Sequence, residues 1–337
     1  MVHTPEATVL APIRDLGKAR LQVRILPPAQ IGLTLIFVKM VVRSNSVAES
    51  SIGISDRSRV RFSPAELKQM LIMASNSKIE WTDHTGNLWW GCSKVHAGCD
   101  NCYAEGQANR YGHKVWGNDA PRMATKSVWS DFLKWQAAAH AAGEIHRVFV
   151  GSMMDIFEKP MPVVNWKGEE IIDYYKKGKV FTLNLRSRFF TEIVPNCPNL
   201  DFLLLTKRPS NINKYVPEEW LVNPPENVMF GASVSDQKTF DDMVYHLKKV
   251  NGRKFLSVEP QLDWIRPTMY QMLGIDWIIQ GGESGPHKRP FDIEWARWLR
   301  DFCAEQGIPY FFKQIDKIQP IPEDLMVREF SHRKKQL

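Results

Sequence analysis

Three of the five cysteines lie in one short stretch, GCSKVHAGCDNCYAE, which covers residues 91–105. Six residues separate Cys92 from Cys99, and two separate Cys99 from Cys102. A C-x-x-C pair is a common metal chelate, and neighbouring glycines let the backbone wrap closely around a metal. Three thiolates on a cubane [4Fe–4S] cluster leave one iron without a protein ligand, open to a substrate or cofactor. The spacing therefore favours an iron–sulfur site.

Zinc is the alternative metal for this stretch. His96 lies between the first two cysteines and would complete a Cys₃His set, which closes a tetrahedral structural zinc site. A disulfide would leave one of the three thiols over. Cys303 adjoins the apolar stripe of a predicted helix, so we expect a buried structural thiol there. Cys197 has no visible partner and is expected in a loop or the core.

The elements that must position these cysteines alternate between strands and helices. Near-continuous apolar runs predict strands that are buried on both faces, as in a parallel sheet. They cover residues 147–152, 201–207, 227–234, 254–260, 276–283 and 309–314, with an earlier strand around 86–91. Amphipathic stretches predict helices after Ser235 and Asp292 as N-caps, the second ending at Gly307. The pattern predicts an α/β fold with a complete or partial (β/α) TIM-type barrel.

Polar side chains follow most of the predicted strands. In a (β/α) barrel the carboxyl ends of the strands meet at one mouth, where the chemistry takes place. We therefore expect one polar ligand pocket. Its predicted members are Ser152, Asp155, Lys207, Arg208, Ser233, Ser235, Ser257, Glu259, Gly282, Glu283 and Ser284.

Residues 1–72 differ in composition from the rest of the chain. They contain no Trp, Tyr or Cys, and ten Lys and Arg residues face only five Asp and Glu residues. The stretch VRILPPAQ near residue 24 is echoed by VRFSPAEL near residue 61 without structural periodicity, as if tandem tRNA-like DNA had been translated. We predict that 1–72 is a non-native or disordered extension, with Met73 as the initiator and 73–337 as the domain. A basic extension that binds nucleic acid is the alternative, and mass spectrometry of the native N-terminus distinguishes the two.

The remaining composition is that of a soluble globular protein. From residue 73 onward, 34 basic residues nearly balance 32 acidic ones, so charge gives no independent support for nucleic-acid binding. The longest apolar run, residues 31–42, is too short to span a membrane and contains Lys39. It also lacks the position and flanks of a secretory signal. We expect a cytoplasmic protein with no membrane partner.

Six stretches in unbroken order carry a family resemblance. They are GCSKVHAGCDNCYAE, FVGSMMDIF, LLLTKRP, FLSVEPQL, GGESGPHKRP and YFFKQ. Together they resemble the phage-encoded three-Cys-motif family of unknown function, which is regarded as similar to radical SAM enzymes. The resemblance implies a [4Fe–4S] cluster held by Cys92, Cys99 and Cys102, with S-adenosylmethionine (SAM) as cofactor. It implies no particular reaction.

Some features depart from the usual radical SAM pattern. Six residues rather than three separate the first two cysteines, and Asn101 replaces the usual aromatic before the third. GGESG follows the sixth strand rather than the second, so no SAM role is transferred to it.

Within the resemblance, roles follow from position at the barrel mouth. Ser152 and Asp155 are the candidates for the methionine moiety of SAM, Ser233 and Ser235 for its ribose, and Tyr103 is a further cofactor contact. The candidate catalytic residues are Glu259, Glu283 and Lys207.

The implied partners are an electron donor and an unknown substrate, with nucleic acid among the candidates. The alternative function is a zinc-stabilised, non-catalytic phage-associated binding module.

Overall fold

The computed structural model describes residues 8–12, 19–24, 37–42, 77–173 and 178–333, and the chain divides into two units, Met1–Arg61 and Phe62–Leu337. The first unit contains a three-stranded antiparallel sheet of β1 (Thr8–Pro12), β2 (Ala19–Arg24) and β3 (Phe37–Val42). The rest of residues 1–72 lies outside the described residues. The hypothesis that this segment is a non-native or disordered extension therefore stays a prediction.

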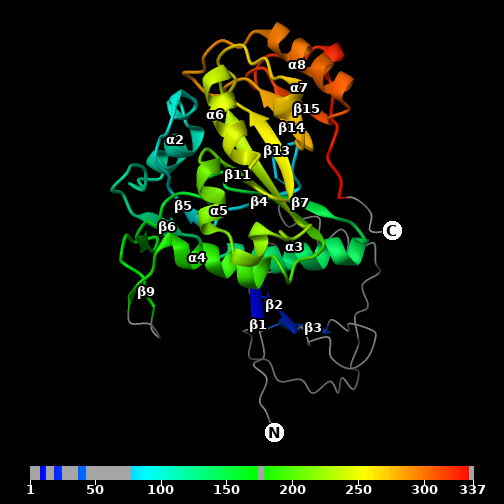
Figure 1. Ribbon diagram of the computed structural model, residues 1–337. Coiled ribbons are helices and arrows are strands. Elements are labelled where there is room, and N and C mark those ends of the chain that lie inside the picture. The colour runs from blue at the N-terminus through cyan, green and yellow to red at the C-terminus, as the bar shows by residue number, and fades with distance from the viewer. Residues whose placement is uncertain (1–7, 13–18, 25–36, 43–76, 174–177, 334–337) are drawn as a thin grey trace, which may run out of the picture. The chain divides into compact units, whose positions relative to one another are not determined.

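The second unit is built on a seven-stranded parallel sheet (Figure 1). The strands lie in sequence order from β4 (His84–Gly86) through β7 (His146–Val150), β11 (Leu200–Thr206), β12 (Val228–Val234), β13 (Arg253–Val258) and β14 (Trp277–Gly281) to β15 (Tyr310–Gln314). This order confirms the predicted α/β class and forms a half-barrel. A complete barrel is not formed in the described part of the chain, because β4 and β15 stand at opposite edges of the hydrogen-bonded order.

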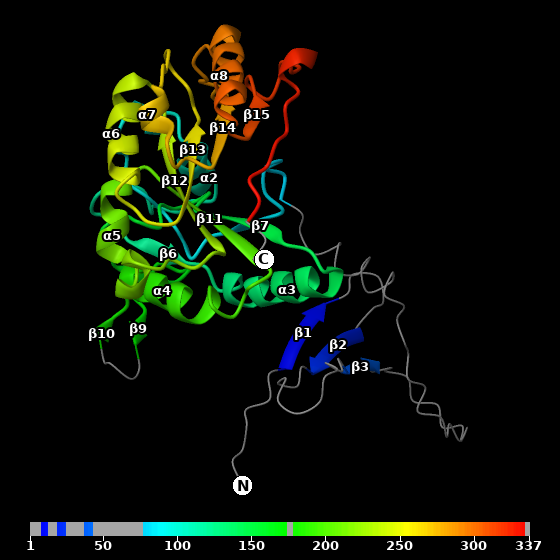
Figure 2. The same cartoon turned by 45° about the vertical axis from the view of Figure 1, so that its right-hand side comes forward.

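Helices cover the outer face of the curved sheet (Figures 1 and 2). They are α3 (Val128–Ala142), α4 (Thr182–Arg188), α6 (Gln237–Leu247) and α8 (Ile293–Gln306), with the short α5 (Ile212–Tyr215) and α7 (Met269–Met272). Alternate strand residues such as Val148, Phe202 and Phe230 pack in the core with buried helix residues such as Phe132, Phe240 and Leu299. Burial on both faces explains the near-continuous apolar runs.

The inner face of the sheet is filled by aromatic and aliphatic side chains. The intervening strand residues form a second buried cluster: Phe149, Leu203, Met229, Phe255, Trp277, Ile279 and Phe311. Trp81, which precedes β4, joins this cluster with its ring centroid 4.7 Å from that of Phe149. The inside of the half-barrel is therefore a packed core below the carboxyl ends of the strands.

The C-terminal segment covers the open side of the half-barrel. Arg328 forms an antiparallel bridge with Phe311 of β15 and an ion pair of 3.1 Å with Glu80, which precedes β4. Phe330 contacts the inner cluster, and the guanidinium of Arg147 on β7 lies 4.1 Å from the centroid of its ring. The tail thus contacts elements from both edges of the sheet.

Two sequence predictions are corrected by the structure. The predicted strand at 86–91 is split: His84–Gly86 joins the main sheet, whereas β5 (Trp89–Trp90) joins a separate sheet with β6 (Arg122–Ala124) and β8 (Val163–Val164). The N-cap of α6 is Asp236 rather than Ser235, because the Asp236 carboxylate accepts the amide of Thr239 at 2.7 Å.

Several other local predictions are confirmed. The carboxylate of Asp292 caps α8 by accepting the amide of Glu294, and Gly307 ends the helix in the left-handed conformation. Cys303 is fully buried, and so is Cys197.

None of the described helices is both long and apolar enough to cross a membrane. A short hairpin of β9 (Ile172–Asp173) and β10 (Gly178–Lys179) completes the described strands.

Candidate functional site

One cavity lies at the carboxyl ends of the parallel strands and has a volume of about 230 Å³. Cys92, Cys99 and Cys102 all line it, although six residues of chain separate the first from the second. Trp81 and Phe149, both members of the inner cluster, also line the cavity. The three clustered thiols thus share one concave site.

Most of the residues predicted at the barrel mouth line this same cavity. They are Tyr103, Ser152, Asp155, Lys207, Arg208, Ser233, Ser257, Glu259, Glu283 and Ser284. Ser235 and Gly282 are not among the lining residues. Ser235 is fully buried, and a Cβ added to Gly98 would lie 2.1 Å from its hydroxyl oxygen. Its place is therefore against the cysteine loop, and its hydroxyl has no hydrogen-bond partner among the described residues.

The cysteine loop is held by close backbone packing. The amide of Gly91 donates to the carbonyl of Met153 at 3.0 Å, and a Cβ at Gly91 would lie 2.3 Å from the carbonyl oxygen of Val115. The left-handed φ of 119° at this position also requires glycine. The loop then forms the short 3₁₀ turn η1 (Ala97–Cys99) and leads through Cys102 into α2 (Tyr103–Arg110).

Cys92 lies beside the guanidinium of Arg208, whose side chain is 12% exposed. Nη1 of Arg208 donates to the Cys92 sulfur at 3.6 Å, while Nη2 donates to the carbonyl and the hydroxyl of Ser93 at 2.7 Å and 2.9 Å. Burial, together with the negative charges of Asp155 and Glu158, raises the pKa of the Cys92 thiol to about 12, and Arg208 acts in the opposite direction. A metal bond at this sulfur therefore requires that a bound cation displace the proton.

Asp155 fixes the orientation of Arg208. Its carboxylate accepts hydrogen bonds from the Thr206 hydroxyl at 2.6 Å, the amides of Phe157 and Lys207 at 3.0 Å each, and Nη1 of Arg208 at 2.7 Å. Four donors occupy both oxygens. The structure thus gives Asp155 a supporting place behind Arg208, and its predicted contact with the methionine moiety of SAM stays a prediction.

A fully buried ion pair lies behind the same corner of the site. The guanidinium of Arg122 makes two hydrogen bonds to the Glu158 carboxylate, at 2.8 Å and 2.5 Å, and the Ser93 hydroxyl donates to that carboxylate at 3.0 Å. Arg122 and Glu158 are 0% and 1% exposed. The sequence analysis missed both, because they lie 36 positions apart in the chain and no local motif marks the pair.

Glu283 ties the cysteine loop to the end of β14. Its carboxylate accepts hydrogen bonds from the Asn101 side chain at 2.9 Å and from Nη2 of Arg289 at 2.7 Å, and Arg289 also donates to the carbonyl of Ala97 at 3.0 Å. Burial opposes ionisation of Glu283, but these hydrogen bonds and the Arg289 charge hold its pKa below the usual value. Asn101, which replaces the expected aromatic residue, thus anchors the loop.

The other predicted residues have specific partners as well. Glu259 forms an ion pair with Lys313 of β15, and its carbonyl accepts the Ser233 hydroxyl at 3.0 Å. The Ser152 hydroxyl accepts a hydrogen bond from Asn87 at 2.8 Å, and the Ser152 carbonyl accepts one from the Tyr103 hydroxyl at 2.9 Å. These contacts place Ser152 and Tyr103 side by side at the cavity wall.

His96 is engaged with the loop itself. Its Nδ1 accepts the amide of Gly98 at 3.1 Å, which caps η1. Burial, reinforced by the positive charge of Lys207, lowers the pKa of His96 to about 4, so the ring is neutral near pH 7. Because Nδ1 is the acceptor, the ring hydrogen is assigned to Nε2, and neither nitrogen offers a free lone pair. Nε2 itself is buried without a hydrogen-bond partner among the described residues, and the Cys₃His zinc site stays the alternative prediction.

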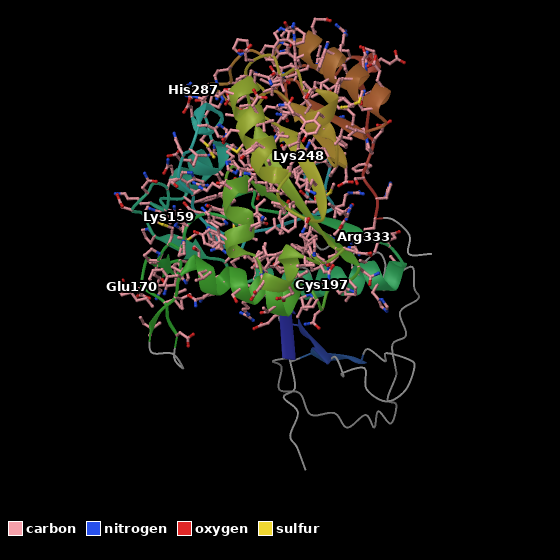
Figure 3. All side chains as sticks on the ribbon, in the orientation of Figure 1. Lys159, Glu170, Cys197, Lys248, His287 and Arg333 are labelled. Atoms are coloured by element: carbon pink, nitrogen blue, oxygen red, sulfur yellow. The ribbon has the colours of Figure 1, made fainter. Side chains whose placement is uncertain are left out.

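The donor set fits an iron–sulfur cluster in the type of its side chains, but not in their spacing. Three free thiols line one cavity, and an arginine N–H points to one sulfur, as is common around cluster thiolates. In the part of the chain that the structure describes, no three His, Cys, Asp or Glu side chains are close enough to hold a metal ion. Cys197 does not belong to this donor set. It lies at the opposite end of the sheet from His287, which lines a neighbouring hollow together with Cys102 (Figure 3).

The family relationship covers most of the second unit. A family model described as "Protein of unknown function (DUF5131)" matches residues 76–178 and 163–335. The chain belongs to this family. No curated protein and no solved structure matches the chain. Membership in DUF5131 assigns no reaction, so the function has to be argued from the site.

Proposed function

We propose that this protein is a radical SAM-type enzyme that binds a [4Fe–4S] cluster through Cys92, Cys99 and Cys102. The observation that carries the proposal is the convergence of these three thiols on one cavity at the carboxyl ends of parallel strands. The resemblance to the phage-encoded three-Cys-motif family supports the same reading.

Cys92, Cys99 and Cys102 would hold the cluster, and the cluster with SAM would supply one-electron chemistry for hydrogen-atom abstraction from the substrate. The protein's own residues have other tasks. Arg208 donates toward the Cys92 sulfur, and Glu283 holds Asn101 between the other two cysteines. The apolar floor with Trp81 and Phe149 would keep water away from the reacting atoms.

The cavity offers polar groups for SAM and substrate on its other walls. Tyr103 and Ser152 lie together on the side of the cysteine loop. Ser233 and Glu259 lie at neighbouring strand ends. Ser233 is the candidate contact for the ribose of SAM, and Glu259 is a candidate catalytic residue. Lys207 follows β11 and also lines the cavity. These placements are compatible with the proposed roles.

The experiment is an iron and acid-labile sulfide determination on protein purified and reconstituted without oxygen. The proposal predicts a brown protein whose visible absorption bleaches with dithionite, and Cys99→Ala should abolish cluster binding. Cys303→Ala is the matched control, because Cys303 is buried in the core, and it should lower the free energy of unfolding by only about 1 kcal/mol.

Two results would count against the proposal. Colourless protein with one tightly held zinc ion would favour the zinc-stabilised binding module instead. Equal loss of iron from Cys99→Ala and Cys303→Ala would show that the loop is not the ligand site.

A further inference from the structure

The cavity carries more positive than negative side chains. Its cationic lining residues are Lys94, Lys207, Arg208, Lys313 and Lys317. Its carboxylates are Asp155, Glu259 and Glu283. Five cations against three carboxylates leave an excess of two positive charges.

Ion pairing shows where this excess lies. Arg208 pairs with Asp155 at 2.7 Å, Lys313 pairs with Glu259, and Lys94 pairs with Glu105 at 3.1 Å. Glu283 is neutralised by Arg289 at 2.7 Å. Lys207 and Lys317 are left, and neither forms an ion pair with any described residue.

Lys317 is held at the cavity by an unusual backbone. Its φ of 69° is the only positive value among the described residues other than glycine. The Asp316 carboxylate fixes this turn by accepting the amides of Ile318 and Gln319, at 2.8 Å and 2.7 Å, and by pairing with Lys288 at 2.9 Å. Left-handed residues of this kind cost energy and cluster where a function requires them.

The proposed cofactors do not remove all of the excess charge. A cubane cluster in its oxidised form with three thiolates carries a single negative charge, and SAM bound to its open iron through an unprotonated amino group carries none. The two together would compensate one of the two positive charges. Lys207 and Lys317 therefore keep an excess of two positive charges while the thiols are free and protonated, and of one when they hold the cluster and SAM.

We propose that Lys207 and Lys317 bind the phosphate of a substrate that is a phosphate monoester. Such a group is close to a dianion above pH 7, which matches the two positive charges of these lysines. The guanidinium groups near the cavity already bond to carboxylates, and lysine binds phosphate as a point charge. This inference deepens the proposed function and rests on it for the reaction, but not for the binding.

The test is isothermal titration of the full chain with inorganic phosphate at pH 8, with and without the reconstituted cluster. We expect measurable binding in both forms, weakened by salt. Replacing Lys207→Gln and Lys317→Gln together should weaken it by about a hundredfold, roughly tenfold for each lost charge-assisted contact. Lys179→Gln is the matched control, because it removes an exposed lysine that is paired with Glu170. Lys317→Arg should keep most of the affinity.

The outcomes separate this inference from the proposed function. Absence of phosphate binding, or equal affinity in the double variant and wild type, would overturn the inference even if the cluster forms. Tighter binding of succinate than of phosphate would overturn the choice of a phosphate. Failure to bind iron would overturn the proposed function. The phosphate-binding inference would still be decided by the difference in phosphate affinity between the wild type and the double variant. Unchanged urea midpoints in the variants establish that they fold.

Discussion

At the scale of single residues, the site is supported by buried charge. Arg208 contacts both Cys92 and Ser93. On the other side of Ser93, the Glu158 carboxylate accepts hydrogen bonds from the Ser93 hydroxyl and from Arg122. A buried charge is stable only while its partner remains, because the attraction between the two charges offsets the hydration free energy that each lost on burial. The cavity wall beside Cys92 therefore depends on Arg122, which does not line the cavity.

Arg122→Met should be strongly destabilising. It leaves the buried Glu158 without its main partner, and we expect a loss of about 3–5 kcal/mol in the free energy of unfolding. Urea denaturation measures this change. The control is Lys134→Ala, which removes an exposed ion pair with Asp131 and should cost less than about 1 kcal/mol. Similar small losses in both variants would contradict the structural role of the Arg122–Glu158 pair.

At the scale of elements, the cysteine loop and the β12–α6 connection fit closely together. Gly98 lies against the buried hydroxyl of Ser235, which follows β12 and precedes the Asp236 cap of α6. No side chain fits at Gly98 without a shift of this contact. The spacing of Cys99 from the strand ends thus depends on a glycine.

Gly98→Ala should displace the loop and reduce the iron content after reconstitution, at a cost of about 1–3 kcal/mol in stability. Adding Ser235→Ala should restore part of the iron, because it removes the nearest clashing atom, while the His96 ring remains at 2.8 Å. Gly106→Ala on α2 is the control. No atom lies within 4 Å of its added Cβ, so we expect full iron content and unchanged or slightly higher stability. Full iron in Gly98→Ala would contradict the close fit.

At the scale of the whole second unit, a half-barrel is completed by segments that are not strands of the main sheet. Trp81 fills the inner core before β4, and the C-terminal tail contacts both edges through Arg328 and Phe330. The indole N–H of Trp277 donates to the carbonyl of Glu329 at 2.9 Å. The tail therefore contributes to the stability of the unit.

Phe330→Ala should lower the free energy of unfolding by about 2–3 kcal/mol, somewhat less than the loss of a fully buried phenylalanine, because the ring is only partly buried. Met326→Ala is the neighbouring control, since Met326 is 55% exposed and should change stability by less than about 0.5 kcal/mol. Equal urea midpoints for the two variants would show that the tail does not secure the half-barrel.

The sequence predicted most strands of this unit because their burial on both faces leaves long apolar runs. It misplaced the first strand, since His84–Gly86 has no apolar run and is short. It also predicted most of the polar residues that meet at the mouth, because parallel strands place their carboxyl ends together, but Ser235 and Gly282 do not line the cavity. It could not predict the partners of those residues: Arg122 with Glu158, or Asn101 with Glu283, join distant segments whose pairing depends on the folded chain.

The most direct test of the central claim is the formation of 5′-deoxyadenosine. Reconstituted protein is incubated with SAM and dithionite without oxygen, and the product is quantified by liquid chromatography and mass spectrometry. The account predicts 5′-deoxyadenosine and methionine in equal amounts from the wild type and from Cys303→Ala, and neither product from Cys99→Ala. Fully reconstituted wild-type protein that leaves SAM intact would contradict it.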